Sequence, residues 1–224
     1  MKILLIPVML LLLVIFSCQK STDNPPASST SYMSMSAGST RNYEITNNNP
    51  PAPPAPYIIT STSRDTIVGT RTFHIFSNST SGSEYYNVSG NDYYSYQRLP
   101  AALGTTSVQN LYLKDNAPVN TSWAQSFNVS VSGIPLTVNI TNKIIEKGVS
   151  RTVNNIIYND VIHVKTDISA NSLFGPITGL TTDIHTYYAP RVGEIENTSV
   201  IDLDFMGFIN HTNTRSVLKS ATIL

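Results

Sequence analysis

The chain has 224 residues, and its 14 basic and 14 acidic side chains leave no net charge at neutral pH. Such a balance produces no global field to attract nucleic acid, so we expect no nucleic-acid partner. Only 12% of the residues are charged, and a single cysteine excludes an intrachain disulfide framework.

The N-terminus has the features of a secretion signal. Lys2 precedes an apolar stretch from Ile3 to Phe16, after which Ser17-Cys18 begins a polar segment. The stretch is shorter than the roughly 20 residues that a helix needs to cross a bilayer, and the small Ser17 suits signal cleavage. We therefore expect residues 1–17 to be a cleaved signal peptide.

The lone cysteine lies at the end of this signal. The run Ile15-Phe16-Ser17-Cys18 resembles the bacterial lipobox, in which the cysteine is acylated and becomes the first residue of the mature protein. This resemblance implies a lipoprotein signal peptide and lipidation at Cys18. It also implies an outer membrane lipoprotein on the periplasmic or cell-surface face, with the membrane as its partner through the acyl chains. A free thiol packed in a core is the alternative.

Two segments of low complexity follow the signal. Residues 18–35 are rich in Ser, Thr, Pro and Asn without an apolar period, which predicts a disordered tether ahead of a single β domain at residues 36–224. The run NNNPPAPPAP at residues 47–56 predicts an extended polyproline loop between strands.

The remaining sequence alternates with the period of β-strands. Residues 126–140 predict a hairpin with one buried face, formed on both sides of a turn at Gly133 by Phe127, Val129, Val131, Leu136, Val138 and Ile140. One short helix is possible after Pro100, and the last residues predict a strand. The pattern predicts an all-β fold with few short helices, built on antiparallel sheet with one solvated face.

Two parts of the sequence resemble each other, and we call this internal similarity the echo. Residues 57–68 (YIITSTSRDTIV) resemble residues 143–154 (KIIEKGVSRTVN). The flanks agree in the same order, GSTRNYEIT with VNTSWAQSFNV before them and YYNVSGNDY with YYAPRVGEI after them. Three blocks in one order favour two duplicated β halves, at residues 36–113 and 117–200, that close around one core. Chance similarity between Thr- and Ile-rich strands is the alternative.

Three features together resemble a large group of small envelope lipoproteins of the Bacteroidota: Trp123 after Asn120, the strand at residues 152–164, and the pattern Y-Y-A-x-x-V-G-x-I at residues 187–195. The resemblance implies a curved sheet or open barrel similar to periplasmic lipid-carrier clams, and it implies no known reaction. Asn155 and Arg191 stand where the group commonly has glycine, so we expect turns there that hold the left-handed conformation.

The sequence carries no recognisable catalytic or metal motif. The four histidines lack the spacing of metal ligands, although Asp183 and His185 share one side of a strand. Asp202 and Asp204 are spaced like a glycosidase pair. The residues that alternate with them are apolar and are expected on the buried face, which leaves the two aspartates on the solvated face. Without a nucleophile motif or a phosphate-binding loop, we expect no enzyme activity, no metal and no cofactor.

Tyrosine is abundant, with 12 in the chain and several in adjacent pairs. On a strand, one ring of a pair faces the core, and its neighbour is left to bind a sugar or a peptide. The candidate ligand-binding residues are therefore Tyr85, Tyr86, Tyr93, Tyr94, Tyr187 and Tyr188.

These patterns lead to two hypotheses of function. The first is a non-enzymatic, lipid-anchored envelope protein that binds a hydrophobic ligand such as a lipid, or a protein partner. The alternative is a surface module that binds glycan through exposed tyrosines. An apolar cavity favours the first hypothesis, and a filled core with exposed tyrosines favours the second. A cleft of converging polar residues with shifted pKa values favours a hydrolase instead.

Overall fold

A computed structural model describes residues 31–99, 107–131, 133–205 and 207–224 of the chain. The predicted signal peptide, Cys18, most of the predicted tether and the helix expected after Pro100 lie outside the described residues. Within the described residues the regular structure is entirely β, and no helix there is long and apolar enough to cross a membrane.

The described residues form one antiparallel sheet of 13 strands. The first strands are β1 Thr40–Asn49, β2 Pro51–Val68, β3 Arg71–Asn78, β4 Gly82–Ser89, β5 Asp92–Arg98 and β6 Ser107–Lys114. They are followed by β7 Ser122–Val131, β8 Ile134–Val153, β9 Ile156–Ser172, β10 Gly175–Pro176, β11 Leu180–Ala189, β12 Gly193–Phe205 and β13 Phe208–Thr222. The order of pairing is β6-β5-β4-β3-β2-β1-β13-β12-β11-β9-β8-β7, and β10 pairs with β9 off this path.

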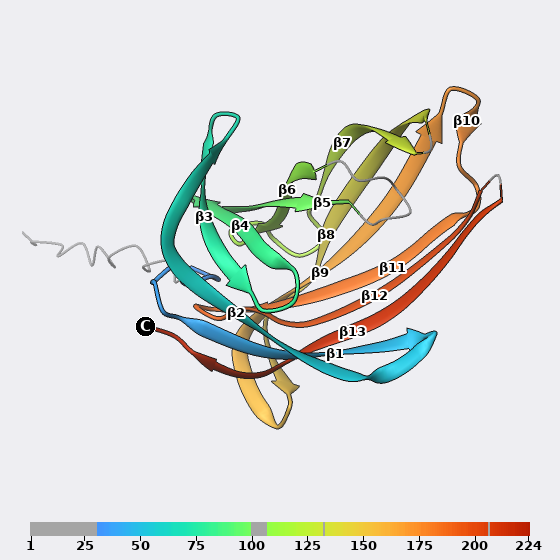
Figure 1. Cartoon of the computed structure of the whole chain (residues 1–224). Coiled ribbons are helices and arrows are strands. Elements are labelled where there is room, and N and C mark those ends of the chain that lie inside the picture. The colour runs from blue at the N-terminus through green and yellow to red at the C-terminus, as the bar shows by residue number, and fades with distance from the viewer. Residues whose placement is uncertain (1–30, 100–106, 132, 206) are drawn as a thin grey trace, which may run out of the picture.

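The sheet curves until its two edge strands, β6 and β7, lie next to each other (Figure 1). Side chains rather than a backbone ladder join these edges. Trp123 Nε1 donates to the Leu111 carbonyl at 2.7 Å, and Leu111 N donates to Gln125 Oε1 at 2.6 Å. Asn142 of β8 donates to the same carbonyl at 3.1 Å. We call the set of Leu111, Trp123, Gln125 and Asn142 the seam. Because side-chain hydrogen bonds connect the two edges here, the barrel is open in its backbone ladder and closed by side chains. The predicted fold class is therefore confirmed.

Each half of the chain forms a meander of six strands, from β1 to β6 and from β7 to β13 without β10. The echoing segments fall on equivalent elements, since residues 57–68 lie in β2 and residues 143–153 in β8. Likewise, YYNVSGNDY spans the β4–β5 hairpin and YYAPRVGEI the β11–β12 hairpin. The second meander continues to Thr222, beyond the predicted limit of 200. A common origin of the two halves stays a prediction.

The first strand of each meander meets the last strand of the other. β1 and β13 pair through a backbone ladder, whereas β7 and β6 meet only through the seam. The two meanders therefore have the same strand order, as the sequence similarity between the halves suggests. They differ in how they join, since backbone hydrogen bonds join β1 to β13 and side chains join β6 to β7.

The folded part of the chain begins before residue 36, the predicted start of the β domain. Tyr32 and Met33 are 5% and 8% exposed and belong to the core. The Tyr32 hydroxyl donates to the Asp160 carbonyl at 2.7 Å, and Arg191 N donates to the Ser31 carbonyl at 2.7 Å. The last residues of the predicted tether thus pack against the barrel, because their two large apolar side chains find burial there.

The run NNNPPAPPAP forms the β1–β2 hairpin, so its prediction as a loop is wrong. β2 begins at Pro51, and Ala55 pairs with Ile45 of β1. This part of β2 has a neighbour on one side only, since its pairing with β3 starts at Ile59. Proline is tolerated at such an edge because its missing N–H faces no strand.

The core consists of two apolar clusters. The first cluster draws on both halves of the chain and includes Tyr32, Tyr43, Phe76, Ile195 and Leu218. The second cluster lies around the β7–β8 hairpin. It includes residues that the sequence placed on one buried face: Phe127, Val129, Leu136, Val138 and Ile140. The predicted hairpin is confirmed, because β7 pairs with β8 in register across it. Asn155 and Arg191 adopt φ values of 62° and 65°, which confirms the left-handed turns expected there.

Closure of the barrel at the seam depends on Gln125. Replacing it with alanine leaves Leu111 N without its acceptor, and a buried donor without a partner costs about 1–3 kcal/mol. We expect Gln125→Ala to lower the free energy of unfolding by this amount in urea titrations followed by circular dichroism. The control is Ser126→Ala on the exposed face of β7, which should change it by less than about 0.5 kcal/mol. Equal losses in both variants would show that the seam adds nothing specific.

Candidate functional site

The barrel contains a cavity of about 360 Å³ that borders both core clusters. Its lining changes in character along each strand. The successive inward residues of β11 are Tyr188, Thr186 and Ile184, and those of β12 run from Glu194 through Asn197 and Ser199 to Ile201. One end of the cavity is therefore aromatic and charged, its middle is polar and uncharged, and its other end is aliphatic.

Five tyrosines, which we call the tyrosine cage, line the first end of the cavity: Tyr43, Tyr57, Tyr86, Tyr112 and Tyr188. Tyr43 and Tyr57 stack with ring centroids 5.0 Å apart. Tyr112 contacts both Tyr86 and Tyr188, at centroid distances of 6.1 and 5.5 Å. Tyr86 and Tyr188 hold equivalent places in the two echoing YY segments, so both meanders contribute to the cage.

The carboxyl group of Glu194 lies among these rings. Burial raises the pKa of every tyrosine in the cage, and the charge of Glu194 raises each of them further. Among the described residues, no donor or cation pairs with the Glu194 carboxyl group. Burial, and then the nearby Glu84, raises the pKa of Glu194 to about 7. Glu194 therefore presents a free carboxyl group that changes charge near neutral pH.

A β-bulge turns Glu194 toward the cavity. In the β11–β12 ladder, Glu196 pairs with Tyr187 and Glu194 pairs with Tyr188, so Ile195 is an extra residue between them. In a regular strand, residues two apart lie on the same face. The bulge places them on opposite faces, Glu194 with the cage and Glu196 with the outer side chains.

Glu84 also lines the cavity, but its oxygens are already bonded. Asn78 Nδ2 and Ser81 Oγ donate to Oε1 at 2.6 and 3.4 Å, and the Tyr86 hydroxyl donates to Oε2 at 2.8 Å. Of the two cavity carboxyl groups, only Glu194 has no hydrogen-bond or ion-pair partner among the described residues.

Arg41 is the third charged residue of the cavity wall and is only 1% exposed. Its Nε donates to the Val192 carbonyl, and its Nη2 donates to the Ser34 carbonyl at 3.0 Å. The guanidinium also lies 5.5 Å from the centroid of the Phe76 ring. Burial lowers the pKa of Arg41. Among the described residues it forms no ion pair with Glu84 or Glu194, so its main contacts tie the N-terminal segment to the β11–β12 turn.

The uncharged middle of the cavity has two unpaired oxygen atoms on one wall. Ser95 Oγ of β5 and Asn110 Oδ1 of β6 have no hydrogen-bond partner within the described part of the chain, although the residues are only 4% and 6% exposed. On the facing wall, Thr166 Oγ1 donates to Asn142 Oδ1 at 2.7 Å. Buried oxygens without a partner are costly, and donors placed in this part of the cavity would remove that cost.

The tyrosines predicted as ligand residues divide between the two faces of the sheet. Tyr86 and Tyr188 line the cavity, and Tyr93, 1% exposed, donates to Asp115 Oδ2 at 2.6 Å in the core. The other three are half-buried on the opposite face: Tyr85, Tyr94 and Tyr187. None of the six is exposed, which differs from the row of exposed rings expected for a glycan platform. Ligand binding by these residues stays a prediction.

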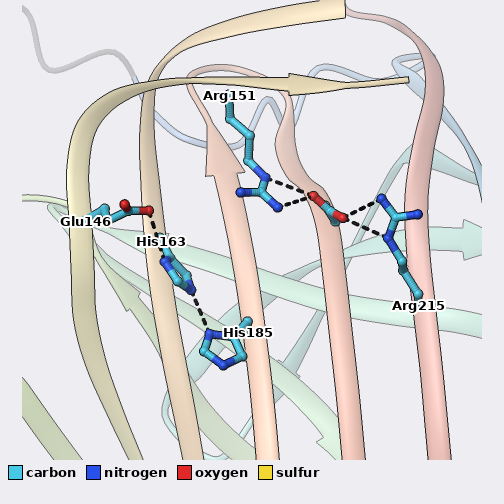
Figure 2. Close-up of polar contacts among 6 residues, drawn as sticks. Glu146, Arg151, His163, His185 and Arg215 are labelled. Atoms are coloured by element: carbon cyan, nitrogen blue, oxygen red, sulfur yellow. Dashed lines mark hydrogen bonds and ion pairs between the residues drawn. The ribbon is translucent and has the colours of Figure 1, made fainter. Parts of the chain in front are cut away.

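Histidines form a chain of contacts on the outer face of β8, β9 and β11 (Figure 2). His163 Nδ1 contacts Glu146 Oε2 at 3.2 Å, and His163 Nε2 contacts His185 Nδ1 at 2.8 Å. His185 Nε2 in turn contacts Asp183 Oδ1 at 2.9 Å. Burial lowers the pKa of His163. The predicted shared face of Asp183 and His185 is confirmed, and the described residues hold no cluster of three or more metal-ligating side chains.

Glu196 joins three strands on the same outer face (Figure 2). Arg151 of β8 donates to its Oε2 through Nη2 at 2.6 Å, and Arg215 of β13 contacts its Oε1 through Nη2 at 2.7 Å. Burial acts to raise the pKa of Glu196, but the bonds from the two arginines outweigh it and lower the pKa. The Glu196 carboxylate therefore forms ion pairs with two arginines, which tie β12 to β8 and to β13 on this face.

The aspartates considered as a glycosidase pair face away from the core. Asp202 contacts His211 Nδ1 at 2.9 Å, and Asp204 is exposed, while Ile201 and Leu203 are 6% and 4% exposed. The predicted division of this strand into a buried and a solvated face is confirmed.

Three charged residues of the cavity, Glu84, Glu194 and Arg41, were not predicted from the sequence. A signal for two of them was present, since Glu84 precedes the first YY pair and Glu194 follows the second YY pair within echoing hairpins. Assigning them to the interior required the bulge at Ile195, which the alternation of residues does not reveal.

Comparison with solved structures shows the fold alone. A "putative lipoprotein" from Parabacteroides distasonis is similar, with a TM-score of 0.50 and 12% identity over 86% of this chain and 99% of that chain. A "putative exported protein with YmcC-like fold" from Bacteroides fragilis has a TM-score of 0.41 and 7% identity over 84% and 96% of the chains. No protein-family model matches the sequence, and the search of curated proteins found no match. The predicted resemblance to Bacteroidota lipoproteins is thus supported at the level of the fold.

The raised pKa of Glu194 makes stability depend on pH. The folded state holds this proton more tightly than the unfolded chain, so this contribution is complete below pH of about 4.5 and is lost as the pH rises through about 7. Glu194→Gln removes the dependence, and at pH 8 we expect the variant to be more stable than the native protein by up to about 3 kcal/mol.

Urea unfolding at pH 5 and pH 8 measures this difference, which should be much smaller at pH 5. Glu44→Gln on the outer face of the barrel is the matched control and should change stability by less than about 0.5 kcal/mol at either pH. A loss of stability in Glu194→Gln at pH 8 would mean that the carboxylate is paired in the folded protein.

Proposed function

We propose that this protein is a non-enzymatic, lipid-anchored envelope protein that binds a small amphiphilic molecule inside its barrel. The observation that carries the proposal is the gradient of the cavity lining, from the tyrosine cage through polar residues to isoleucines. A volume of about 360 Å³ lies within the range of about 300–1,000 Å³ typical of ligand pockets. A purely apolar ligand would leave the polar end without partners.

Anchoring is supported by the signal sequence and by the fold. The lipobox-like run ends at Cys18, and the similar structure from Parabacteroides distasonis is described as a "putative lipoprotein". The resemblance of residues 15–18 to a lipobox also supports a location in the outer membrane.

Hydrolysis is a second candidate function, favoured by the two carboxyl groups of the cavity. Glu194 holds a proton up to a pH of about 7, as a general acid does, and Glu84 lies close enough to raise its pKa. We rank binding first because Glu84 is held by three donors and is not available to attack a substrate or to activate water. Recovery of a bound molecule chemically unchanged after long incubation distinguishes binding from turnover.

Filling the aliphatic end of the cavity should weaken binding strongly. We expect residues 18–224 with Cys18→Ala, which keep every described residue, to take up the uncharged probe N-phenyl-1-naphthylamine with a rise in its fluorescence. Adding Ile184→Trp should weaken uptake at least about tenfold, since the larger ring occupies the cavity. Thr181→Trp, which places the same ring on the exposed face of β11, should not change it. Equal binding by both variants would place the probe elsewhere.

Acylation of Cys18 is directly measurable. In cells fed a labelled fatty acid, the native protein should carry the label and Cys18→Ala should carry none, because the alanine offers no thiol for the acyl group. Ser17→Ala keeps a small residue at the cleavage site and should remain labelled. Persistence of the label in Cys18→Ala would contradict the lipoprotein assignment.

A further inference from the structure

The charges of the cavity wall do not balance. Glu84 and Glu194 bring two carboxyl groups, and Arg41 brings one guanidinium. When both carboxyl groups are ionised, the wall carries one net negative charge in a site of low dielectric. A buried charge without a partner is unfavourable, and a ligand with one positive charge would remove this cost.

Glu194 is the place where such a charge would bind. Glu84 is bonded by three donors, whereas the Glu194 carboxyl group has no partner among the described residues. The ionised carboxylate accepts strong, charge-assisted hydrogen bonds from a protonated amine. An anionic group would meet two like charges at the same position.

The rings around Glu194 favour the same kind of ligand. The five tyrosines of the cage all line the cavity and all lie near the Glu194 charge. Aromatic faces attract cations through their quadrupole, and cages of such rings are a known way to hold ammonium groups. The two meanders bring these rings together around one carboxyl group.

The middle of the cavity offers further acceptors. Ser95 Oγ and Asn110 Oδ1 are unpaired oxygens on the β5–β6 wall, and both residues are more than nine-tenths buried. They suit N–H or O–H donors next to the amine. Beyond them, Ile140, Ile168 and Ile184 form an aliphatic wall for the remainder of the ligand.

We propose that the ligand is an amphiphile with a protonated amine, bound by Glu194 within the tyrosine cage, with its aliphatic part along the isoleucines. This inference rests on the proposed function and names the chemical class of its ligand. Arg41 also has one nitrogen, Nη1, without a partner among the described residues. An amphiphilic acid would use that nitrogen, so the test includes one.

Three probes with the same ten-carbon chain separate these possibilities: decylamine, decan-1-ol and decanoate. Each is titrated at pH 8 against N-phenyl-1-naphthylamine bound to residues 18–224 with Cys18→Ala. We expect decylamine to bind at least about tenfold more tightly than decanol, and decanoate to bind more weakly than decanol. In Glu194→Gln the advantage of the amine should disappear while the affinity for decanol stays the same. Glu44→Gln, a carboxyl change on the outer face, should keep the amine preference.

The outcomes distinguish this inference from the proposed function. If all three probes bind equally well, or decanoate binds best, the amine inference is overturned while the cavity remains a binding site. If neither the fluorescent probe nor any of the three binds, the proposed function fails and the inference fails with it. The comparison of probes on the unmutated cavity needs no variant, so it decides the matter even if Glu194→Gln does not fold.

Discussion

The number of strands around the barrel is the constraint on which the rest of the structure depends. Side chains just fill the interior of a barrel of about eight strands, and the interior widens as strands are added. Here 12 strands follow one another along the path from β6 to β7. Even with five tyrosines and Arg41 pointing inward, a cavity of about 360 Å³ remains. The internal cavity therefore follows from the width of the barrel.

The position of the free carboxyl group follows from the way β12 is held. The bulge at Ile195 turns Glu194 inward and Glu196 outward, two residues apart on one strand. Glu196 is clamped by Arg151 and Arg215, which fixes β12 against rotation. Ion pairs of this kind hold a register more reliably than they add stability. The outer network thus keeps the inner carboxyl group aimed at the cavity.

The sequence predicted the architecture better than the site. Alternation identified the β7–β8 hairpin and the buried face of β12, because each rests on a local period of two. The sequence did not predict the strand in NNNPPAPPAP, because proline is tolerated at the edge of a sheet. It also did not predict the burial of Tyr32 and Met33, because that burial depends on contacts with distant strands.

The candidate site was only partly accessible to such reasoning. Paired tyrosines were recognised as important, and Tyr86 and Tyr188 do line the cavity, but the period of two cannot say which ring of a pair faces inward. The period of two also fails to place Glu194 and Tyr112, because the register shifts at Ile195 in β12 and at Tyr112 in β6 change which residues of these two strands face inward. A bulge is a property of the pair, so the sequence of one strand does not encode it visibly.

The seam connects closure of the barrel to the contents of its cavity. A backbone ladder joins β1 to β13, but the bonds between β6 and β7 involve side chains, so the seam lacks the regular ladder that holds the other junction. Asn142 belongs to both features, since it donates to the Leu111 carbonyl across the seam and lines the cavity beside Thr166. A ligand in the middle of the cavity therefore contacts a residue that closes the barrel. Filling the cavity and closing the seam are, for this reason, expected to stabilise each other.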